Sequence, residues 1–214
     1  MFRRRTEAHQ NEAFGTREQA QHYAQQAAKS MLKYRAFLNV LQGLDISGHY
    51  LDVGAGPGVL AAAVAQQQPG VTITALELSP EMVVIGRETV TSQKLADRIT
   101  YVEGDVMDVT LMQSLGAFDL IYSTFTLHHF DDVSRVLHIL AGNLKDGGRL
   151  VFYDLRRAWW LYWIPSQRGF FQSVRAAYVT REIEQLFMDA PLMLEKNTPT
   201  APFLQTVIAR KSSM

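Results

Sequence analysis

A glycine-rich turn with a carboxylate beside it is the strongest chemical signal in the sequence. Residues Leu51–Gly58 have the sequence LDVGAGPG, a predicted strand that ends in a G-x-G-x-G turn. Val59 stands where the dinucleotide-binding pattern G-x-G-x-x-G has its third glycine. Such a turn lets a ligand approach the backbone closely. The carboxylate of Asp52 would repel a pyrophosphate and attract an ammonium or sulfonium group, so the sequence favours a cationic ligand over a polyanionic one.

Two further acidic residues follow the next two predicted strands. Glu77 ends the second strand, 19 residues after Gly58, where a carboxylate in this topology can accept hydrogen bonds from both hydroxyls of a ribose. Asp105 follows the third strand, where a carboxylate can bind the exocyclic amine of an adenine. Each acid taken alone is equally consistent with the cap of a turn or helix. Three acids at the carboxyl ends of successive strands, beside a glycine turn, favour a binding site.

Two adjacent histidines, His128 and His129, come directly after the fourth predicted strand. A neutral imidazole at this position can deprotonate a hydroxyl or thiol, or orient it by hydrogen bonding. We expect His129 to be the catalytic residue, with His128 as the second candidate. The competing interpretation is structural, with one ring packed under the sheet edge and the other capping the next helix. Adjacent side chains usually diverge and no third ligand is evident, so we expect no metal.

Short apolar runs that alternate with helical periodicity must position these residues. The runs occupy residues 50–53, 71–76, 99–102, 118–122 and 150–153, and helices are expected at about 58–68, 80–93 and 132–144. The expected N-caps are Ser79 and either Asp131 or Asp132. Runs of this length, separated by helices, predict a parallel sheet with helices on both faces.

The two ends of the chain depart from this alternation. Apolar residues at helical spacing up to Gly43 predict one long helix, or two with a break near Ser30. After Asp154, the pattern predicts a short helix that begins at Thr180 and two last strands near 192–197 and 203–210. The link Thr198–Pro202 is short enough to make these strands antiparallel.

The composition bounds the class of protein. The 214 residues are 47% hydrophobic, with 21 Lys and Arg against 21 Asp and Glu, which indicates one globular domain with a substantial core. A formal net charge of zero provides no field that would attract nucleic acid. The absence of Cys excludes disulfides, zinc thiolate sites and a Cys nucleophile. No secretory signal or membrane span is evident, so we expect a cytoplasmic protein, with peripheral membrane contact left open.

Five motifs follow one another over residues 48–154. They are LDVGAGPG, ALELS, EGDV, FDLIYSTFTLHHF and KDGGRLVFYD. In this order they resemble the motifs of class I S-adenosylmethionine-dependent methyltransferases, and most closely the UbiE-like small-molecule group. The resemblance implies a Rossmann-like, doubly wound α/β fold with a mostly parallel seven-stranded sheet in the order 3-2-1-4-5-7-6, in which strand 7 is antiparallel. It also implies S-adenosylmethionine as the cofactor and S-adenosylhomocysteine as the product.

The same resemblance implies cofactor contacts and a division of the chain. The implied contact residues are Asp52, Gly54, Ala55, Gly56, Gly58, Glu77, Leu78, Asp105, Val106 and Ser123. The whole chain, residues 1–214, is expected to be a single methyltransferase domain. Within it, residues 1–47 are expected to form an N-terminal helical lid, residues 48–154 the cofactor-binding core, and residues 155–214 the acceptor-side cap and the closing strands.

The methyl acceptor is expected to be a small molecule with a hydroxyl, a thiol or an activated carbon. The stretch Ser123–Thr126 lacks the Asn/Asp-Pro-Pro-aromatic motif of relatives that methylate amino groups of DNA bases or glutamine. Aromatic residues within 154–165 leave the carboxyl end of the fifth strand, where open α/β sheets bind ligands, and are expected to cap the acceptor. The expected acceptor contacts are Tyr23, Asp154, Arg156, Arg157, Trp159, Arg175 and Tyr178.

Other interpretations remain open at this stage. The aromatic stretch is also consistent with ordinary core packing, or with a membrane-contact or dimer surface, and we expect a monomer or a homodimer. A nicotinamide-dependent oxidoreductase is consistent with the glycine turn and Glu77, but Asp52 and the missing third glycine oppose it. A catalytically idle protein that binds S-adenosylmethionine is the remaining alternative, because a complete cofactor motif does not establish turnover.

Overall fold

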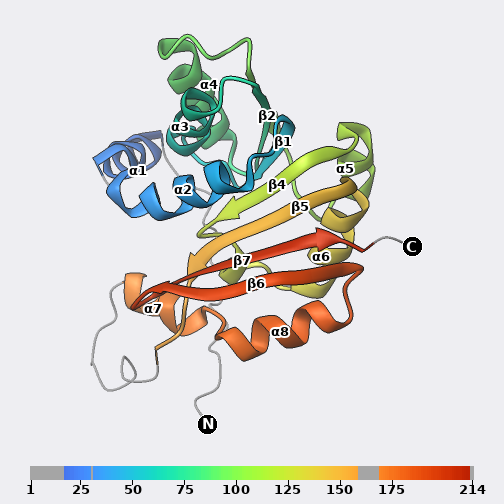
Figure 1. Ribbon diagram of the computed structural model, residues 1–214. Coiled ribbons are helices and arrows are strands. Elements are labelled where there is room, and N and C mark those ends of the chain that lie inside the picture. The colour runs from blue at the N-terminus through green and yellow to red at the C-terminus, as the bar shows by residue number, and fades with distance from the viewer. Residues whose placement is uncertain (1–16, 30, 159–168, 213–214) are drawn as a thin grey trace.

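One seven-stranded sheet forms the centre of the protein in the computed structural model, which describes residues 17–29, 31–158 and 169–212 (Figure 1). The strands are β1 (Gly48–Val53), β2 (Val71–Glu77), β3 (Ile99–Glu103), β4 (Phe118–Thr124), β5 (Leu144–Leu155), β6 (Leu192–Ala201) and β7 (Leu204–Lys211). Their order is β3-β2-β1-β4-β5-β7-β6. The first five pair in parallel, and β7 is antiparallel to both β5 and β6. The predicted Rossmann-like, doubly wound fold is confirmed.

Helices connect the parallel strands, as the alternating pattern predicted, and further helices precede β1 and follow β5. The helices are α1 (Arg17–Lys29), α2 (Arg35–Leu44), α3 (Val59–Gln67), α4 (Pro80–Ser92), α5 (Val109–Leu115), α6 (Val133–Gly142), α7 (Gly169–Ala176) and α8 (Thr180–Met188), with 3-10 turns η1 (Met31–Tyr34) and η2 (Leu127–His129). The hydroxyl of Ser79 caps α4 by accepting a hydrogen bond from the backbone N of Met82 at 3.4 Å. Asp132 caps α6 by accepting from the backbone N of Arg135 at 2.9 Å. Both expected N-caps are confirmed.

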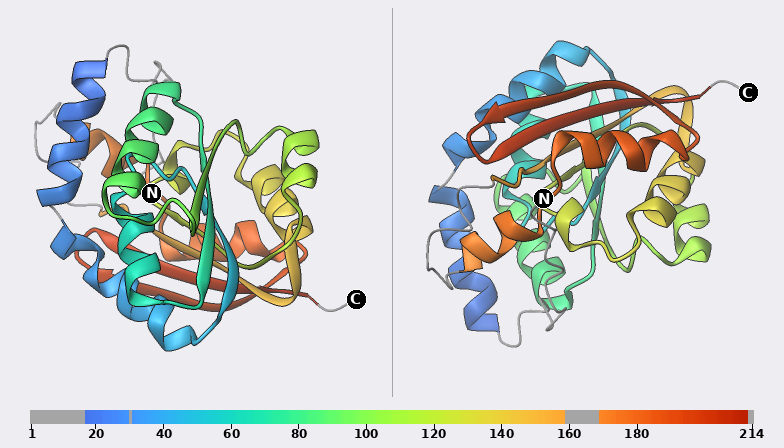
Figure 2. Two further views of the ribbon diagram at one scale, coloured as in Figure 1. Left: turned by 90° about the horizontal axis from the view of Figure 1, so that it is seen from above. Right: turned by 90° about the horizontal axis from the view of Figure 1, so that it is seen from below.

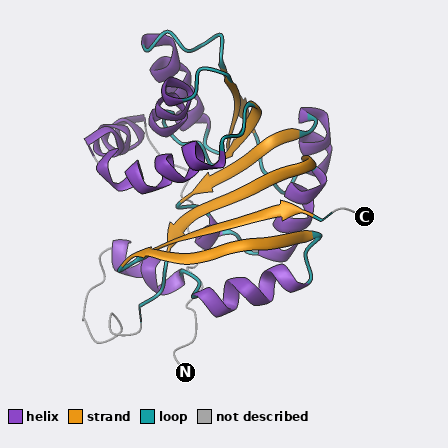
Figure 3. Cartoon of the chain, in the orientation of Figure 1, coloured by secondary structure: helices purple, strands orange, loops and turns teal. Residues whose placement is uncertain are grey.

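Helices cover both faces of the sheet and create two apolar layers (Figures 2 and 3). Along β4, Leu120 and Tyr122 pack in the layer that contains α2, α3 and α4. The intervening Ile121 packs in the other layer, with α5, α6 and α8. Because successive side chains of a strand point to opposite faces, a strand covered on both sides is apolar throughout. This explains why the sequence shows continuous apolar runs rather than alternation.

The structure resolves one alternative that the sequence left open, and it differs from the sequence prediction at α5 and at the end of β6. The N-terminal helical segment is divided into α1 and α2 by η1, so the alternative with a break is correct, although residue 30 itself lies outside the described part of the chain. The sequence pattern did not predict α5, whose seven residues are too few for a clear helical period. Strand β6 continues to Ala201, so the link to β7 is Pro202–Phe203 rather than the predicted Thr198–Pro202.

Candidate functional site

A cavity of about 1410 Å³ opens at the carboxyl edge of the parallel strands. One part of its wall, here called the glycine-turn half, comprises residues 52–57, 76–79 and 104–107. A second part of the wall, here called the aromatic half, includes Lys33, Tyr34, residues 124–126, His128–Phe130, Phe170 and Phe203. Pockets for one drug-sized ligand typically measure about 300–1,000 Å³. The cavity therefore has room for two ligands, at the edge where open α/β sheets bind them.

The glycine turn after β1 has a backbone geometry that favours glycine. Gly54, Gly56 and Gly58 have φ angles of +74°, +56° and +80°, which L side chains rarely adopt. A Cβ on Gly54 would lie 2.7 Å from Oγ1 of Thr126, and one on Gly58 would lie 2.7 Å from the hydroxyl of Tyr101. A Cβ on Gly56 would have no heavy atom within 4 Å, and Gly56 lines the cavity. The turn at Gly56 therefore leaves open space for a ligand.

The carboxylate of Glu77 accepts hydrogen bonds from two backbone amides, one in this turn and one at the start of α4. Its Oε2 accepts a hydrogen bond from the N of Gly56 at 2.8 Å, and its Oε1 accepts one from the N of Ser79 at 2.9 Å. Burial raises the pKa of Glu77, and the hydrogen bonds from Ser79, Gly56 and Leu78 oppose that rise. Glu77 also lines the cavity. It can thus fix the turn and present its carboxylate to a ligand.

Asp52 is the most deeply buried acid of the cavity wall. Its side chain is 1% exposed, and its Oδ2 has no hydrogen-bond partner within the described residues. Burial raises the pKa of Asp52 to about 8, and the nearby hydroxyl of Tyr122 only partly opposes this rise. That hydroxyl itself lacks a partner with hydrogen-bond geometry in the same residues. A buried unpaired carboxylate is unfavourable, so the position fits a ligand that brings a cationic group.

The third acid, Asp105, lies in the exposed turn after β3. Its Oδ1 accepts a hydrogen bond from the backbone N of Met107 at 2.8 Å, which is the turn-capping role that the sequence left open. Leu78 lines the cavity although it is 65% exposed, and Val106 lies buried in the wall. An apolar surface bordered by a carboxylate suits a flat ring with an exocyclic amine.

Comparison with known proteins supports the predicted family. Residues 51–152, just under half of the chain, match the protein family described as "Methyltransferase domain". Over these residues the chain is similar to class I S-adenosylmethionine-dependent methyltransferases, as the motifs predicted. The cofactor of this class is S-adenosylmethionine, as the sequence predicted, and the nicotinamide alternative is set aside. The unpaired Oδ2 of Asp52 and the open space at Gly56 fit a cationic ligand that lies against the glycine turn.

Relatives of the methyltransferase domain include two named quinone methyltransferases. A demethylmenaquinone methyltransferase of Porphyromonas gingivalis is 32% identical over 108 residues, which cover 50% of this chain and 43% of that protein. The ubiquinone/menaquinone biosynthesis C-methyltransferase UbiE of Geobacter sp. is 28% identical over 156 residues, 67% of this chain and 66% of that protein. The chain thus spans under half of the first relative's length and about two thirds of the second's.

A solved structure supports the fold over nearly the whole chain. A SAM dependent methyltransferase from Aquifex aeolicus has a TM-score of 0.72 at 16% sequence identity. The alignment covers 91% of this chain and 97% of that one. At this identity the likeness establishes the shared architecture and leaves the acceptor to be argued from the cavity.

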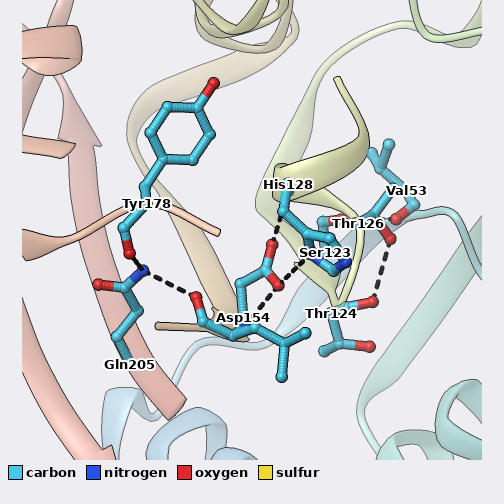
Figure 4. A network of polar contacts seen from close by, with 9 residues as sticks. Val53, Ser123, Thr124, Thr126, His128, Asp154, Tyr178 and Gln205 are labelled. Carbon is cyan, nitrogen blue, oxygen red and sulfur yellow. Dashed lines mark hydrogen bonds and ion pairs between the residues drawn. The ribbon is translucent and has the colours of Figure 1, made fainter. Parts of the chain in front are cut away.

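The two histidines have different surroundings, and Figure 4 shows His128 beside Asp154. His128 is 4% exposed, with its Nδ1 2.6 Å from Oδ1 of Asp154, while its backbone N donates to Oδ2 of Asp154 at 3.0 Å. His129 is half-buried, lies in the cavity wall, and packs against the His128 ring, with a centroid separation of 3.9 Å and an angle of 42° between the ring planes. The predicted pair does reach the cavity, and the structure adds a partner for His128 that sequence reasoning missed.

Asp154 and Arg157, two expected acceptor contacts, lie instead in buried polar networks. Asp154 is 2% exposed and accepts hydrogen bonds from His128 and from the backbone N of Leu155 at 2.5 Å. Arg157 is 6% exposed, donates to the carbonyl of Ala177 at 3.0 Å and pairs with Glu182. Neither belongs to the cavity wall formed by the described residues. Because a buried charge needs a partner, the hydrogen bonds of these two side chains are made to other groups of the protein.

Three more expected acceptor contacts also lie away from the cavity wall of the described chain. Arg156 bonds to the β6–β7 turn, with its backbone N donating to the carbonyl of Phe203 at 2.7 Å. Tyr178 is 8% exposed in the apolar layer beside α8, and its carbonyl accepts from Nε2 of Gln205 at 2.9 Å (Figure 4). Arg175 is on α7 but is not among the described wall residues.

Two expected cofactor contacts have structural roles instead, and two acceptor contacts stay predictions. Ser123 is 1% exposed, and its hydroxyl donates to the carbonyl of Val53 at 2.8 Å, which joins β4 to β1 (Figure 4). Gly58 is the N-cap of α3 and is absent from the described wall. The side chain of Tyr23 and the whole of Trp159 lie outside what the structure describes.

The aromatic half of the wall contains residues that sequence reasoning did not select. Lys33, Phe125 and Phe203 line it beside Tyr34 and Phe170. Phe125 lies inside the motif FDLIYSTFTLHHF, so its position was the available signal. Lys33 and Phe203 carry no local signal, because they reach the cavity through η1 and the β6–β7 turn, which are far apart in the sequence.

Proposed function

We propose that the protein transfers a methyl group from S-adenosylmethionine to a small-molecule acceptor with a hydroxyl, a thiol or an activated carbon. The observation that carries this proposal is the joint lining of one cavity by Asp52, Glu77 and Asp105 on its glycine-turn half and by His129 on its aromatic half. The cavity volume of about 1410 Å³ supports simultaneous binding of cofactor and acceptor.

The glycine-turn half would hold the cofactor. Asp52 would take the ammonium group, Glu77 the ribose hydroxyls and Asp105 the adenine amine. Ala55 and Gly56 line the cavity at the turn itself, and Gly54 precedes them there. The free backbone space at Gly56 and the unpaired Asp52 support this placement.

The aromatic half would align the acceptor and manage its proton. When bound, S-adenosylmethionine supplies an electrophilic methyl group on a sulfonium. His129 would accept the proton of a hydroxyl or thiol acceptor, and His128 would hold the His129 ring in place through the contact between the two tilted rings. Asp154 fixes His128 in turn. Phe125 and Phe203 would exclude water from the reacting groups.

Calorimetry with S-adenosylhomocysteine, followed by transfer of labelled methyl groups into a metabolite extract, tests the proposal. We expect saturable binding and at least one labelled product. Absence of binding would refute the cofactor site. Binding without any transfer across extracts of differing composition would favour the catalytically idle alternative.

Replacing Glu77 with Ala should weaken S-adenosylhomocysteine binding about a hundredfold. The substitution removes a charged acceptor of two hydroxyls, worth about 2–3 kcal/mol, and also frees the backbone N of Gly56. Calorimetry measures the change. Glu103→Ala is the matched control, because Glu103 is an exposed acid at the end of the neighbouring strand. Affinity within about threefold of the parent for Glu77→Ala would overturn the ribose assignment.

Replacing Asp52 with Asn should stabilise the free protein and weaken cofactor binding. Between about pH 4 and pH 8 the folded state keeps a proton on Asp52 that the unfolded chain, with a pKa of 3.8, has lost. The free energy of unfolding therefore falls as pH rises through this range and levels off above about pH 8. Asn carries no charge to bury, so at pH 8.5 we expect the variant to gain about 2 kcal/mol in free energy of unfolding over the parent. Its Tm should then lie about 4–8 °C above that of the parent at pH 8.5, with little difference between the two at pH 4.

The same Asp52→Asn variant should bind S-adenosylmethionine about tenfold more weakly, because it cannot neutralise the cationic group. Affinity of the parent should increase from pH 6 towards pH 8 as Asp52 ionises, and this increase should shrink in the variant. Asp97→Asn, at an exposed position, is the control. A variant that is less stable than the parent at pH 8.5 and binds the cofactor equally well would contradict the assignment.

We propose further that the chain forms a single domain, with residues 1–47 as lid, 48–154 as cofactor-binding core and 155–214 as acceptor side. The cavity draws wall residues from all three segments, such as Tyr34, Glu77 and Phe203, which supports this division. We place the protein in the cytoplasm as a monomer or homodimer. Within the described ranges, no helix is both long and apolar enough to cross a membrane.

A further inference from the structure

Lys33 is the one Lys or Arg in the cavity wall that the described residues form. The acids Asp52, Glu77 and Asp105 lie on the glycine-turn half, whereas Lys33 lies on the aromatic half. No acidic side chain in the described part of the chain forms an ion pair with it. The wall also contains Asp131 and Asp132, which directly follow His128–Phe130, so its acids are not confined to the glycine-turn half. Lys33 is thus the one Lys or Arg side chain that the described wall offers to an anionic group of a ligand.

Two aromatic rings fix the position of this positive charge. Nζ of Lys33 lies 4.9 Å from the ring centroid of Tyr34 and 4.9 Å from that of Phe125. The two rings meet edge to face, with centroids 5.6 Å apart. The hydroxyl of Tyr153 donates to the carbonyl of Lys33 at 3.0 Å and anchors the backbone. The side chain keeps contact with solvent, while partial burial lowers the pKa of Lys33.

Phe125 occupies a backbone conformation that bulky residues rarely adopt. Its φ is +57°, where glycine or asparagine would be easier to accommodate. Its backbone N donates to the carbonyl of Tyr153 at 2.9 Å, and its ring packs against the Tyr153 ring with 5.8 Å between the ring centroids. Strained positions of this kind persist where the surrounding structure enforces them, and they concentrate at ligand sites. Here the strain places an aromatic ring in the cavity wall beside Lys33.

We propose that Lys33 and Phe125 select a flat aromatic acceptor that carries an anionic group, such as a carboxylate or sulfonate. The aromatic part packs on Phe125, and the anion meets the Lys33 ammonium, which is desolvated in part by the two rings. This inference rests on the proposed function and specifies its acceptor class. The proposed role differs from two simpler roles for Lys33. In one, Lys33 only holds the N-terminal helical segment through its cation-π contacts, and in the other it binds the carboxylate of the cofactor.

A pair of fluorescent dyes tests the charge directly, without turnover. The probes are 8-anilinonaphthalene-1-sulfonate and N-phenyl-1-naphthylamine, which share one aromatic skeleton and differ by the sulfonate. Both are titrated into protein saturated with S-adenosylhomocysteine. In Lys33→Met we expect affinity for the sulfonate dye to fall about tenfold and affinity for the neutral dye to change less than twofold. Lys33→Arg should retain the sulfonate preference, and Phe125→Ala should weaken both dyes.

Matched controls make each outcome decisive. Lys94→Met removes an exposed lysine away from the cavity and should change neither dye. Equal loss of both dyes in Lys33→Met, no loss of either, or no binding of the dyes to the parent would overturn the proposal. A tenfold loss of S-adenosylhomocysteine affinity in Lys33→Met, with unchanged affinity for 5′-methylthioadenosine, would assign Lys33 to the cofactor carboxylate instead. Failure of the proposed function would appear earlier, as absent binding of S-adenosylhomocysteine to the parent.

Discussion

Replacing His129 with Ala lowers methyl transfer about 10²–10⁴-fold and leaves the affinity for S-adenosylhomocysteine unchanged. His129 lies in the aromatic half of the wall, away from the three acids proposed to hold the cofactor. Loss of a positioned general base has an effect of this size on turnover, whereas loss of mere positioning accounts for about tenfold or less. The comparison requires single-turnover rates at saturating cofactor, with an acceptor identified from the metabolite extract.

The pH dependence of the same reaction provides a second readout. The rate of the parent should fall towards acid pH as an imidazole base becomes protonated, and the residual rate of His129→Ala should lose this dependence. His138→Ala is the matched control, because His138 is an exposed histidine on α6 outside the described wall. A parent rate that stays flat through this range would favour an acceptor that needs no base, such as a thioether or an activated carbon.

His128 requires a separate test because its imidazole is part of the buried pair with Asp154. Its removal leaves a carboxylate that is 2% exposed without its side-chain partner, so His128→Ala should lower Tm as well as activity. His129→Ala should leave Tm nearly unchanged. If a well-folded His128→Ala variant loses all turnover while His129→Ala keeps it, the two histidines exchange roles.

The cofactor side could be predicted from the sequence because its signals are local. Asp52 and the glycine turn are adjacent in the chain, and Glu77 and Asp105 follow two apolar runs of β-strand length. In a parallel sheet the carboxyl ends of neighbouring strands meet at one edge, so chain position alone brings these residues to one cavity. The order of the strands followed from the family resemblance, and the observed pairing confirms it.

The acceptor side could not be predicted in the same way because its residues meet through long-range packing. Asp154 pairs with His128, 26 positions away, and Arg157 pairs with Glu182, 25 positions away. In the sequence, a charged residue after a strand resembles a ligand contact. When the fold buries that residue, its charge must instead be paired with a group of the protein, and the sequence does not show which group that is. Lys33 shows the opposite case, since it has no local signal and reaches the cavity only because the N-terminal helical segment packs against β4 and β5.

Replacing Gly56 with Val should abolish measurable binding of S-adenosylhomocysteine, a loss of roughly a thousandfold or more. A Cβ at this position has no atom within 4 Å, so the new side chain projects into the open space where the cofactor should lie. The φ of +56° also opposes a β-branched residue and would shift the backbone N that Glu77 binds. Calorimetry and thermal unfolding, measured on the same samples, separate lost binding from lost folding.

Gly147→Val is the control for backbone strain, so that the remaining loss in Gly56→Val is due to the side chain in the cavity. Gly147 has a φ of +76°, and a Cβ there would also have no atom within 4 Å, but it lies outside the cavity wall of the described residues. Both variants should therefore lose comparable stability, about 1–3 kcal/mol from backbone strain, while only Gly56→Val loses the cofactor. Retained binding in a folded Gly56→Val variant would remove the whole assignment of the glycine-turn half. The proposed contacts to the ribose and to the ammonium group of the cofactor both lie at this turn, so this one substitution tests them together.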